Sequence, residues 1–149
     1  MTNRNFTGRY YHNIDAKNRI MMPSKFRELL GEDFYITEGF EGCINVLPAD
    51  EWDELSSQMK ALPKYSADAR LIRRTIGSGA VTCEADKQGR ILIPGHLKEH
   101  AALSREVVII GVIDNVEIWD SEKWQQYRRG EGALTMEDAA ANLEKQRNV

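Results

Sequence analysis

The sequence predicts an α+β domain, mainly β, in which the two halves of one chain share a single core. Three observations lead to this class. The chain repeats itself at an offset of 71 residues, its apolar segments are short and separated by turn residues, and each half is only about 70 residues long. A hairpin-built unit of that size buries little core by itself. We therefore expect the halves to complete one another as an internal pseudo-dimer, with short helices at its edges.

The repeat appears when the chain is shifted against itself, which indicates a duplicated structural unit. At the offset of 71 residues the aligned pairs are Gly8 and Gly79, Asp15 and Asp86, Arg19 and Arg90, Ile20 and Ile91, Pro23 and Pro94, and Glu28 and Glu99. After one inserted residue, Trp52 aligns with Trp124. Each half is therefore predicted as strand, tight turn, strand, short helix, hairpin and a helix that carries tryptophan.

The first strand and the tight turn come first in each half. Residues 6–12 and 80–85 are rich in aromatic or β-branched side chains and run into an aspartate, as a strand entering a turn should. The turn at 86–90 has Gly89 where a hairpin loop with a bulge requires a positive φ. The first half has Asn18 there, and asparagine also tolerates that conformation.

Short apolar strands follow at 19–22 and 90–93, and each one stops at a proline. Pro23 and Pro94 suit the first turn of a helix, where the missing N–H costs nothing. We expect the first of these helices to end at Gly31, because glycine commonly follows the last helical residue.

Hairpins and amphipathic helices complete both halves. Apolar segments flank turn residues within 34–47 and within 107–119, which predicts two hairpins. Apolar residues at helical spacing follow each hairpin, and Asp50 and Ser121 are the expected N-caps of these helices.

The remaining segments connect the halves and end the chain. Residues 66–76 have a helical pattern that we expect Gly77-Ser78-Gly79 to break. In the acidic tail, Thr135 and Asp138 are placed to cap a short helix, and a frayed end is the alternative. We divide the chain into a first repeat at 8–54, a helical connector at 55–79, a second repeat at 80–126 and a tail at 127–149 that is helical or disordered.

The net charge of −3 conceals an alternation along the chain. Residues 1–30 carry a net charge of +4, residues 31–69 of −7, residues 70–100 of +3 and residues 101–149 of −3. An acidic protein disfavours nucleic acid as a partner, but each basic block here contains one copy of the repeated turn. This coincidence favours DNA binding modestly over a pure scaffold.

The repeated aspartates and arginines have a structural and a binding interpretation. Each aspartate can cap its turn while it pairs with the arginine four residues further on, so the expected turn-structural residues are Asp15, Asn18, Asp86 and Gly89. An arginine projected by a rigid hairpin also suits contacts with phosphate or a guanine edge. The predicted DNA-binding residues, expected to cluster on one face, are Arg19, Lys17, Arg9, Arg90 and Lys87.

One motif suggests a different chemistry. His96, Glu99 and His100 satisfy the H-x-x-E-H pattern of some zinc peptidases, so a metal-dependent hydrolase is an alternative. Against it, the helix is short, no third ligand is evident, and His100 corresponds to a leucine in the first half. Phosphate-loop, dinucleotide-binding and nucleophile-elbow motifs are absent from the sequence. We therefore predict no enzyme, cofactor, metal or small-molecule substrate.

Cysteine use and hydropathy indicate the compartment. Cys43 and Cys83 form no C-x-x-C pair and lie in apolar segments, which is typical of unreactive thiols in a reducing cytoplasm. No apolar run approaches the ~20 residues of a membrane helix, and the first residues lack a signal-peptide pattern. We expect a cytoplasmic protein without a membrane partner.

Two segments carry a resemblance to a known family. Residues 8–23, GRYYHNIDAKNRIMMP, and residues 83–94, CEADKQGRILIP, closely resemble the two halves of the bacterial MraZ proteins. Glu51-Trp52 and the segment 110–119 agree as well, so the resemblance extends to about Tyr127. The tail beyond Gly130 is not covered.

The resemblance implies an AbrB-like swapped-hairpin barrel, with both half-barrels supplied by one chain. It implies a sequence-specific transcriptional regulator of the cell-division and cell-wall gene cluster, including its own promoter. It also implies a nucleoid-associated homo-oligomer, a ring that brings several hairpins to closely spaced repeated boxes on double-stranded DNA. A protein-interaction module without a DNA target is the alternative.

The family's arginine in its D-x-x-G-R motif falls on Arg19 and Arg90. Asn18 departs from the usual glycine, so the two turns are not equivalent. The first basic block also carries the larger charge, and we expect Arg19 to contribute more than Arg90.

Overall fold

The two halves of the chain contribute strands to the same sheets. The computed structural model describes residues 4–131 and 134–147. The strands are β1 (Arg9–Asn13), β2 (Arg19–Met21), β3 (Phe34–Glu38), β4 (Ile44–Pro48), β5 (Val81–Cys83), β6 (Arg90–Leu92), β7 (Glu106–Gly111) and β8 (Val116–Asp120). The helices are α1 (Ser24–Leu30), α2 (Ala49–Ala61), α3 (Ala67–Gly79), α4 (Gly95–His100), α5 (Ser121–Arg128) and α6 (Met136–Arg147), with a 3₁₀ turn at Phe40–Gly42.

The main sheet is antiparallel and has the strand order β1-β7-β8-β4-β3-β5. β1 of the first half pairs with β7 of the second, and β5 of the second half pairs with β3 of the first. β4 and β8 join the halves in the middle. The order is therefore the same from either end when the halves are exchanged, and the predicted pseudo-dimer is confirmed.

A separate two-stranded ribbon of β2 and β6 is the second link between the halves. The two tight turns form where the sequence predicts them, but the strands on either side of each turn do not pair with one another. They pair across the halves instead, and in this arrangement Ile20 and Ile91 are both buried in one shared core. The sheet does not close into a barrel in the described residues, and β1 and β5 are its edges.

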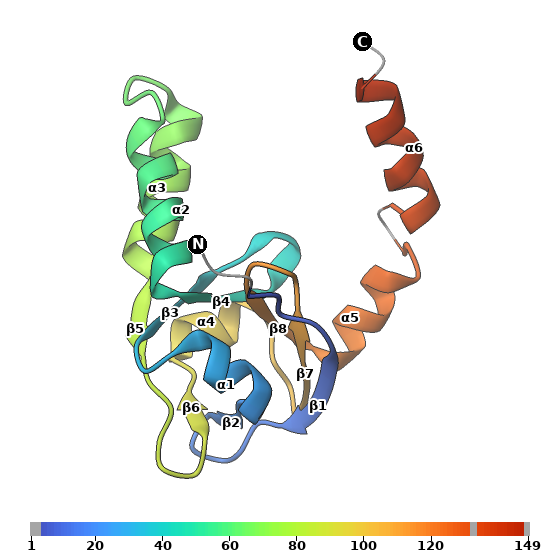
Figure 1. The fold of residues 1–149 in the computed structure, drawn as a ribbon. Coiled ribbons are helices and arrows are strands. Elements are labelled where there is room, and N and C mark those ends of the chain that lie inside the picture. The colour runs from blue at the N-terminus through green and yellow to red at the C-terminus, as the bar shows by residue number, and fades with distance from the viewer. Residues whose placement is uncertain (1–3, 132–133, 148–149) are drawn as a thin grey trace.

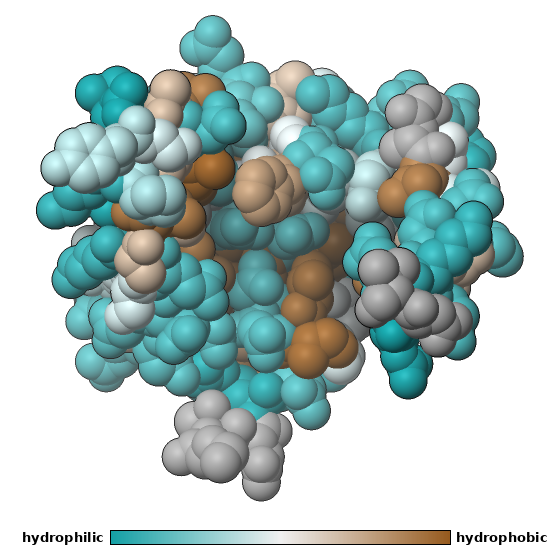
Figure 2. Space-filling view, turned by 90° about the horizontal axis from the view of Figure 1, so that it is seen from above, coloured by the Kyte–Doolittle hydropathy of each residue, from teal (hydrophilic) through white to brown (hydrophobic). Residues whose placement is uncertain are grey.

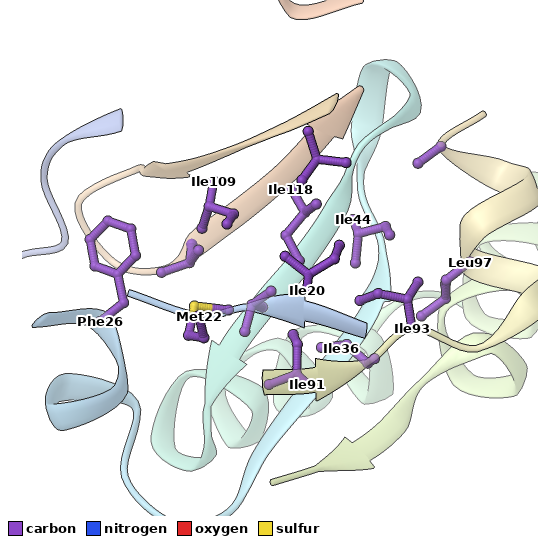
Figure 3. Packing of buried hydrophobic residues seen from close by; sticks show 14 of the residues in the cluster. Ile20, Met22, Phe26, Ile36, Ile44, Ile91, Ile93, Leu97, Ile109 and Ile118 are labelled. Carbon is purple, nitrogen blue, oxygen red and sulfur yellow. The ribbon is translucent and has the colours of Figure 1, made fainter. Parts of the chain in front are cut away.

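The shared core fills the space between the ribbon and the sheet. Ile20 and Ile91 lie opposite one another in the ribbon register and are fully buried. Figure 3 shows them facing isoleucines from the sheet, among them Ile44 and Ile118. Apolar burial of this kind drives folding, and both halves contribute residues to this one core.

The α+β class is confirmed, and helices hold more residues than strands because the connector and the tail are helical. In Figure 1, α2 and α3 rise side by side as one arm, and α5 and α6 rise as a second arm on the same side of the sheet. Figure 2 shows the molecule from this side, with hydrophobic residues visible between the two arms. The ribbon and the two turns lie at the opposite end. No helix in the described part of the chain is both long and apolar enough to cross a bilayer.

The prolines and helix caps differ in detail from the expectation. Pro23 and Pro94 precede α1 and α4 as N-cap residues, one position before the first helical turn. Asp50 and Ser121 are not the N-caps. Asp120 caps α5 by accepting the Lys123 N–H, and Asp50 lies inside the first turn of α2, where it pairs with Arg4 at 2.7 Å.

The helix at the connector was predicted to break at Gly77, and that prediction is wrong. Ser66 caps α3, and the helix runs through Gly77 to Gly79. Packing against β3 stabilises this last turn, since Thr37 on that strand donates its hydroxyl to the Ile76 carbonyl. In the tail, α6 is a helix, and Thr135 and Asp138 cap it reciprocally.

Candidate nucleic-acid interface

The first tight turn is fixed by one carboxylate. Asp15 Oδ1 accepts the backbone N–H groups of Lys17 and Arg19 at 2.9 and 2.8 Å. Its second oxygen, Oδ2, accepts Nε of the Arg19 side chain at 2.8 Å. The Asp15 side chain thus sets both the turn and the direction of the arginine.

The second turn repeats this geometry. Asp86 Oδ1 accepts the N–H groups of Gln88 and Arg90, both at 2.9 Å, and Asp86 Oδ2 accepts Arg90 Nε at 3.0 Å. The predicted structural role of Asp15 and Asp86 therefore has a geometric basis in both halves.

Both carboxylates are held in the ionised form. The N–H of Arg19 is the largest cause that lowers the pKa of Asp15 below its usual value, and the N–H of Arg90 does the same for the pKa of Asp86. Hydrogen bonds to a charged carboxylate favour that charge. The turns therefore keep their geometry throughout the neutral range.

The corner of each turn has the left-handed backbone that the sequence predicts. Asn18 has a φ of 61° and Gly89 a φ of 85°. Asparagine and glycine are the residues that adopt this region most readily. Lys17 and Lys87, next to the corners, are exposed.

The outer face of the ribbon presents the arginines. Ile20 and Ile91 point into the core, so the residues on either side of them point outwards. Arg19 lies opposite Leu92, and Arg90 lies opposite Met21. Leu92 is 61% exposed, although it is a large apolar residue on a regular strand. The ribbon face therefore combines two cations with apolar surface.

The ion pairs leave part of each guanidinium available. Arg19 and Arg90 contact their aspartates through Nε, and 29% and 27% of their side-chain surface is exposed. Among the described residues, their terminal Nη groups have no hydrogen-bond partner. Two parallel N–H donors on one arginine match a phosphate or the O6 and N7 acceptors of guanine.

Arg9 lies apart from the other predicted binding residues. Its guanidinium lies over the ring of Trp124 on α5, 5.4 Å from the centroid. It stands at the far end of β1 from the first turn. Arg19 and Arg90 share the ribbon and Lys17 and Lys87 lie in its two turns, whereas Arg9 lies outside this group.

The surroundings of the two turns differ in charge. Beside the second turn, Glu32, Asp33 and Glu84 line a shallow pocket together with Asp86 and Arg27. The corresponding stretches in the other half, Asn13 and residues 103–105, contain no acidic side chain. The first turn therefore has the less negative surroundings.

Three residues near the ribbon were not predicted from the sequence. Lys98 and Arg27 contact the turn corners, and Leu92 lies opposite Arg19 on the ribbon. The repeat contains a signal for the first two, because the offset of 71 residues aligns Arg27 with Lys98 as a second basic pair. Strand alternation with buried Ile91 and Ile93 indicates the outward position of Leu92.

The two histidines of the H-x-x-E-H motif are held by different groups. His96 Nε2 lies 3.0 Å from the Gly79 carbonyl. His100 Nε2 lies 3.0 Å from the Cys43 carbonyl, and its Nδ1 lies 3.1 Å from Glu38. Within 4–131 and 134–147, no group of three or more metal-ligating side chains converges. The hydrolase alternative therefore gains no support from the geometry.

The two cysteines are free thiols in packed surroundings. Burial raises the pKa of the Cys43 thiol far above its usual value. Burial likewise raises the pKa of Cys83 to about 11. Since the thiolate is the nucleophile, neither residue is activated for chemistry.

A duplicated fold with strands exchanged between the halves, and with one Asp–Arg turn at each end of a shared ribbon, defines an AbrB-like swapped-hairpin protein. The family model described as "MraZ protein, putative antitoxin-like" matches residues 5–75 and again residues 76–146. The chain belongs to the MraZ family, and the double match confirms the internal repeat.

Individual relatives agree with the family model. The chain is 51% identical to "Transcriptional regulator MraZ" of Heliobacterium modesticaldum over 93% of this chain and 96% of that protein. It is 47% identical to the protein of the same name from Pelotomaculum thermopropionicum, over 93% and 94%. The corresponding protein of Caldanaerobacter subterraneus subsp. tengcongensis is 46% identical over 92% and 95%.

Proposed function

We propose that this protein is a sequence-specific DNA-binding transcriptional regulator. The observation that carries the proposal is the outer face of the β2–β6 ribbon, where Arg19 and Arg90 are each aimed by an aspartate through Nε. Relatives that are named as transcriptional regulators support the same class of function. The resemblance of the repeats supports the cell-division and cell-wall gene cluster, including the protein's own promoter, as the target.

The dimensions of the ribbon suit the major groove of duplex DNA. That groove is about 12 Å wide and admits a two-stranded β-ribbon. Arg19 pairs with Leu92, and Arg90 pairs two residues further along the ribbon with Met21. At about 3.4 Å per residue, the arginines are separated by roughly 7 Å along the ribbon. Both side chains can therefore reach base edges or phosphates of one groove, with Lys17 and Lys87 nearer the backbones.

We expect the first turn to contribute more of the affinity. The acidic side chains Glu32, Asp33 and Glu84 surround the second turn, and phosphate is repelled there. No acid occupies the corresponding positions around the first turn. Arg19 and Lys17 should therefore contact DNA more strongly than Arg90 and Lys87.

The proposed assembly is a homo-oligomeric ring in the cytoplasm, associated with the nucleoid. One ribbon contacts few phosphates and would bind weakly at physiological salt. Several ribbons on one ring, facing closely spaced repeated boxes, raise the effective concentration of each further contact. The alternation of acidic and basic blocks supports this arrangement. A solution mass equal to one chain at working concentrations would contradict it.

A gel-shift titration with the duplex upstream of the protein's own gene tests the function. It compares the wild type with Arg19→Ala and Arg90→Ala across a salt series, with Arg74→Ala on exposed α3 as the matched control. If an arginine contacts a base, its replacement by alanine should cost on the order of 1–3 kcal/mol of binding free energy and relax specificity. We expect the larger loss for Arg19→Ala.

Other outcomes have distinct meanings. An arginine that contacts only phosphate should weaken binding to all duplexes alike and reduce the salt slope by about one. Wild-type binding that is weak and indifferent to sequence would instead favour a protein-interaction module. Unchanged binding in both variants would assign the arginines to the turns alone and overturn the proposed interface.

A further inference from the structure

The corner of the first turn is held by a side chain from the other half. Lys98 on α4 donates from Nζ to Asn18 Oδ1 at 2.8 Å, across 80 residues of sequence. Both residues are half-buried. The Asn18 carbonyl accepts the N–H of Ile93, which precedes Pro94, the N-cap of α4, at 2.8 Å. Asn18 thus makes one backbone and one side-chain contact with the second half.

The corner of the second turn is held by the first half in a complementary way. The Gly89 carbonyl accepts the N–H of Met22 at 2.9 Å. Arg27 on α1 lies where a side chain at position 89 would be, because a Cβ on Gly89 would come within 2.8 Å of Arg27 Cζ. The guanidinium is itself fixed by donating from Nε to the Met22 carbonyl at 3.0 Å.

These two contacts are equivalent in the repeat. Arg27 and Lys98 are separated by the offset of 71 residues, as are Asn18 and Gly89. At the first corner the Lys98 ammonium contacts the Asn18 amide oxygen. At the second corner the Arg27 guanidinium occupies the space that a side chain at position 89 would need. The residue at each corner therefore matches the cation that faces it.

We propose that Lys98 and Arg27 are positioning residues that hold each turn from the opposite half. Because each turn is held by the opposite half, the position of Arg19 relative to Arg90 depends on both halves together and not on either turn alone. The consequence for DNA rests on the proposed function, whereas the contact between the halves does not. In this proposal Lys98 acts through Asn18, whose amide oxygen its ammonium contacts, and not as a direct phosphate ligand.

Two substitutions without a charge change test the proposal. Asn18→Gly keeps a residue suited to the positive φ but removes the acceptor for Lys98. Gly89→Asn introduces a side chain where Arg27 lies. Two readouts are taken: amide hydrogen exchange of 15–19 and 86–90 without DNA, and affinity for the upstream duplex across a salt series. Thermal unfolding checks that each variant is folded.

We expect Asn18→Gly to speed exchange in the first turn and to weaken DNA binding on the order of fivefold, as the loss of one hydrogen bond implies. The salt slope should not change. Lys98→Met should speed exchange to the same extent, the double variant should add nothing further, and Lys98→Arg should restore wild-type exchange. Gly89→Asn should loosen the second turn in the same manner.

Three results separate the possible failures. Wild-type exchange and affinity in Asn18→Gly would overturn the positioning role. A salt slope reduced by about one in Lys98→Met, with Asn18→Gly silent, would make Lys98 a phosphate ligand and also overturn it. If the wild type bound no duplex at all, the proposed function would fail, and hydrogen exchange alone would decide whether the turns are held across the halves.

Discussion

Arg19 on β2 lies directly opposite Leu92 on β6, so a cation and an exposed apolar side chain share the outer face of the ribbon. Leu92 is 61% exposed and is not part of the core cluster. A leucine exposed beside an arginine, on the ribbon that we propose faces DNA, suits a contact with the C5-methyl group of thymine, the apolar group in the major groove. In the proposed complex, the arginine and the leucine would contact neighbouring bases.

Leu92→Ala should lower DNA affinity without lowering stability. The free energy of unfolding should stay within about 0.5 kcal/mol of wild type, because an exposed side chain is removed. Replacing thymine by uracil in the duplex removes the methyl group, and wild type should lose affinity on that probe. Leu92→Ala should be insensitive to the replacement. Equal sensitivity of both proteins in fluorescence anisotropy titrations would refute the contact.

Ala102→Gly should stabilise the protein. Ala102 follows α4 with a φ of 48°, whereas its repeat counterpart Gly31 is a glycine at a φ of 83°. Glycine removes the strain that alanine has in the left-handed region. Part of this gain is offset because glycine gives the unfolded chain more conformational entropy. We expect a gain of about 0.5–1 kcal/mol, which raises Tm by roughly 1–4 °C in calorimetry. As a control, Ala61→Gly at the last helical position of α2 should lower Tm, and a lower Tm in Ala102→Gly would contradict the strain argument.

Glu117→Gln should stabilise the protein at neutral pH and not at acidic pH. Burial raises the pKa of Glu117 above its usual value, against the opposing hydrogen bond from Trp119 Nε1 at 2.9 Å. Below the unfolded-state pKa both states are protonated and burial carries no charge penalty. As the pH rises through the raised pKa of the folded state, the buried carboxyl ionises and the free energy of unfolding of the wild type falls. Glutamine stays uncharged at every pH in this range, and its amide oxygen can still accept the hydrogen bond from Trp119.

Urea denaturation at pH 4 and pH 7 measures this difference. The advantage of Glu117→Gln should be present at pH 7 and shrink towards pH 4. The same advantage at both values would show that the ionisation of Glu117 plays no part.

Residues 1–79 alone should not fold as a monomer. β1, β2 and β4 each lose their partner from the second half, and buried Ile20 and Ile44 lose the surface that they pack against. Circular dichroism with sedimentation velocity should show an unfolded monomer, or structure only where two fragments associate. Full-length protein is the control and should unfold in one transition. A cooperative, monomeric fragment would show that the halves are independent.

The local features of the fold were predictable, because a few residues determine them by themselves. The Asp15 and Asp86 turns, the positive φ at Asn18 and Gly89, and the duplication all follow from short sequence patterns. Strand pairing across the halves depends on long-range packing, and the patterns of the repeat leave it open. Tertiary contacts likewise carry α3 through Gly77, where local propensity predicts a break.

The sequence predicts the two arginines of the candidate site, but not which residues from elsewhere in the chain lie beside them. Arg19 and Arg90 are placed by their own turns, so sequence spacing locates them. Arg9 shares their charge but is drawn to the Trp124 ring, a contact between residues 115 positions apart. Lys98 reaches the first turn only because α4 of the second half packs beside it.

Pairing between β2 and β6 within one chain has a consequence for how the two turns can change. In a dimer of identical subunits, any substitution in one turn appears in the other, and the pair separates on dilution. Here the linker through α3 makes the association intramolecular, so it is independent of protein concentration. Each turn can also be substituted without changing the other. The two turns do differ, since Asn18 faces Lys98 and Gly89 faces Arg27.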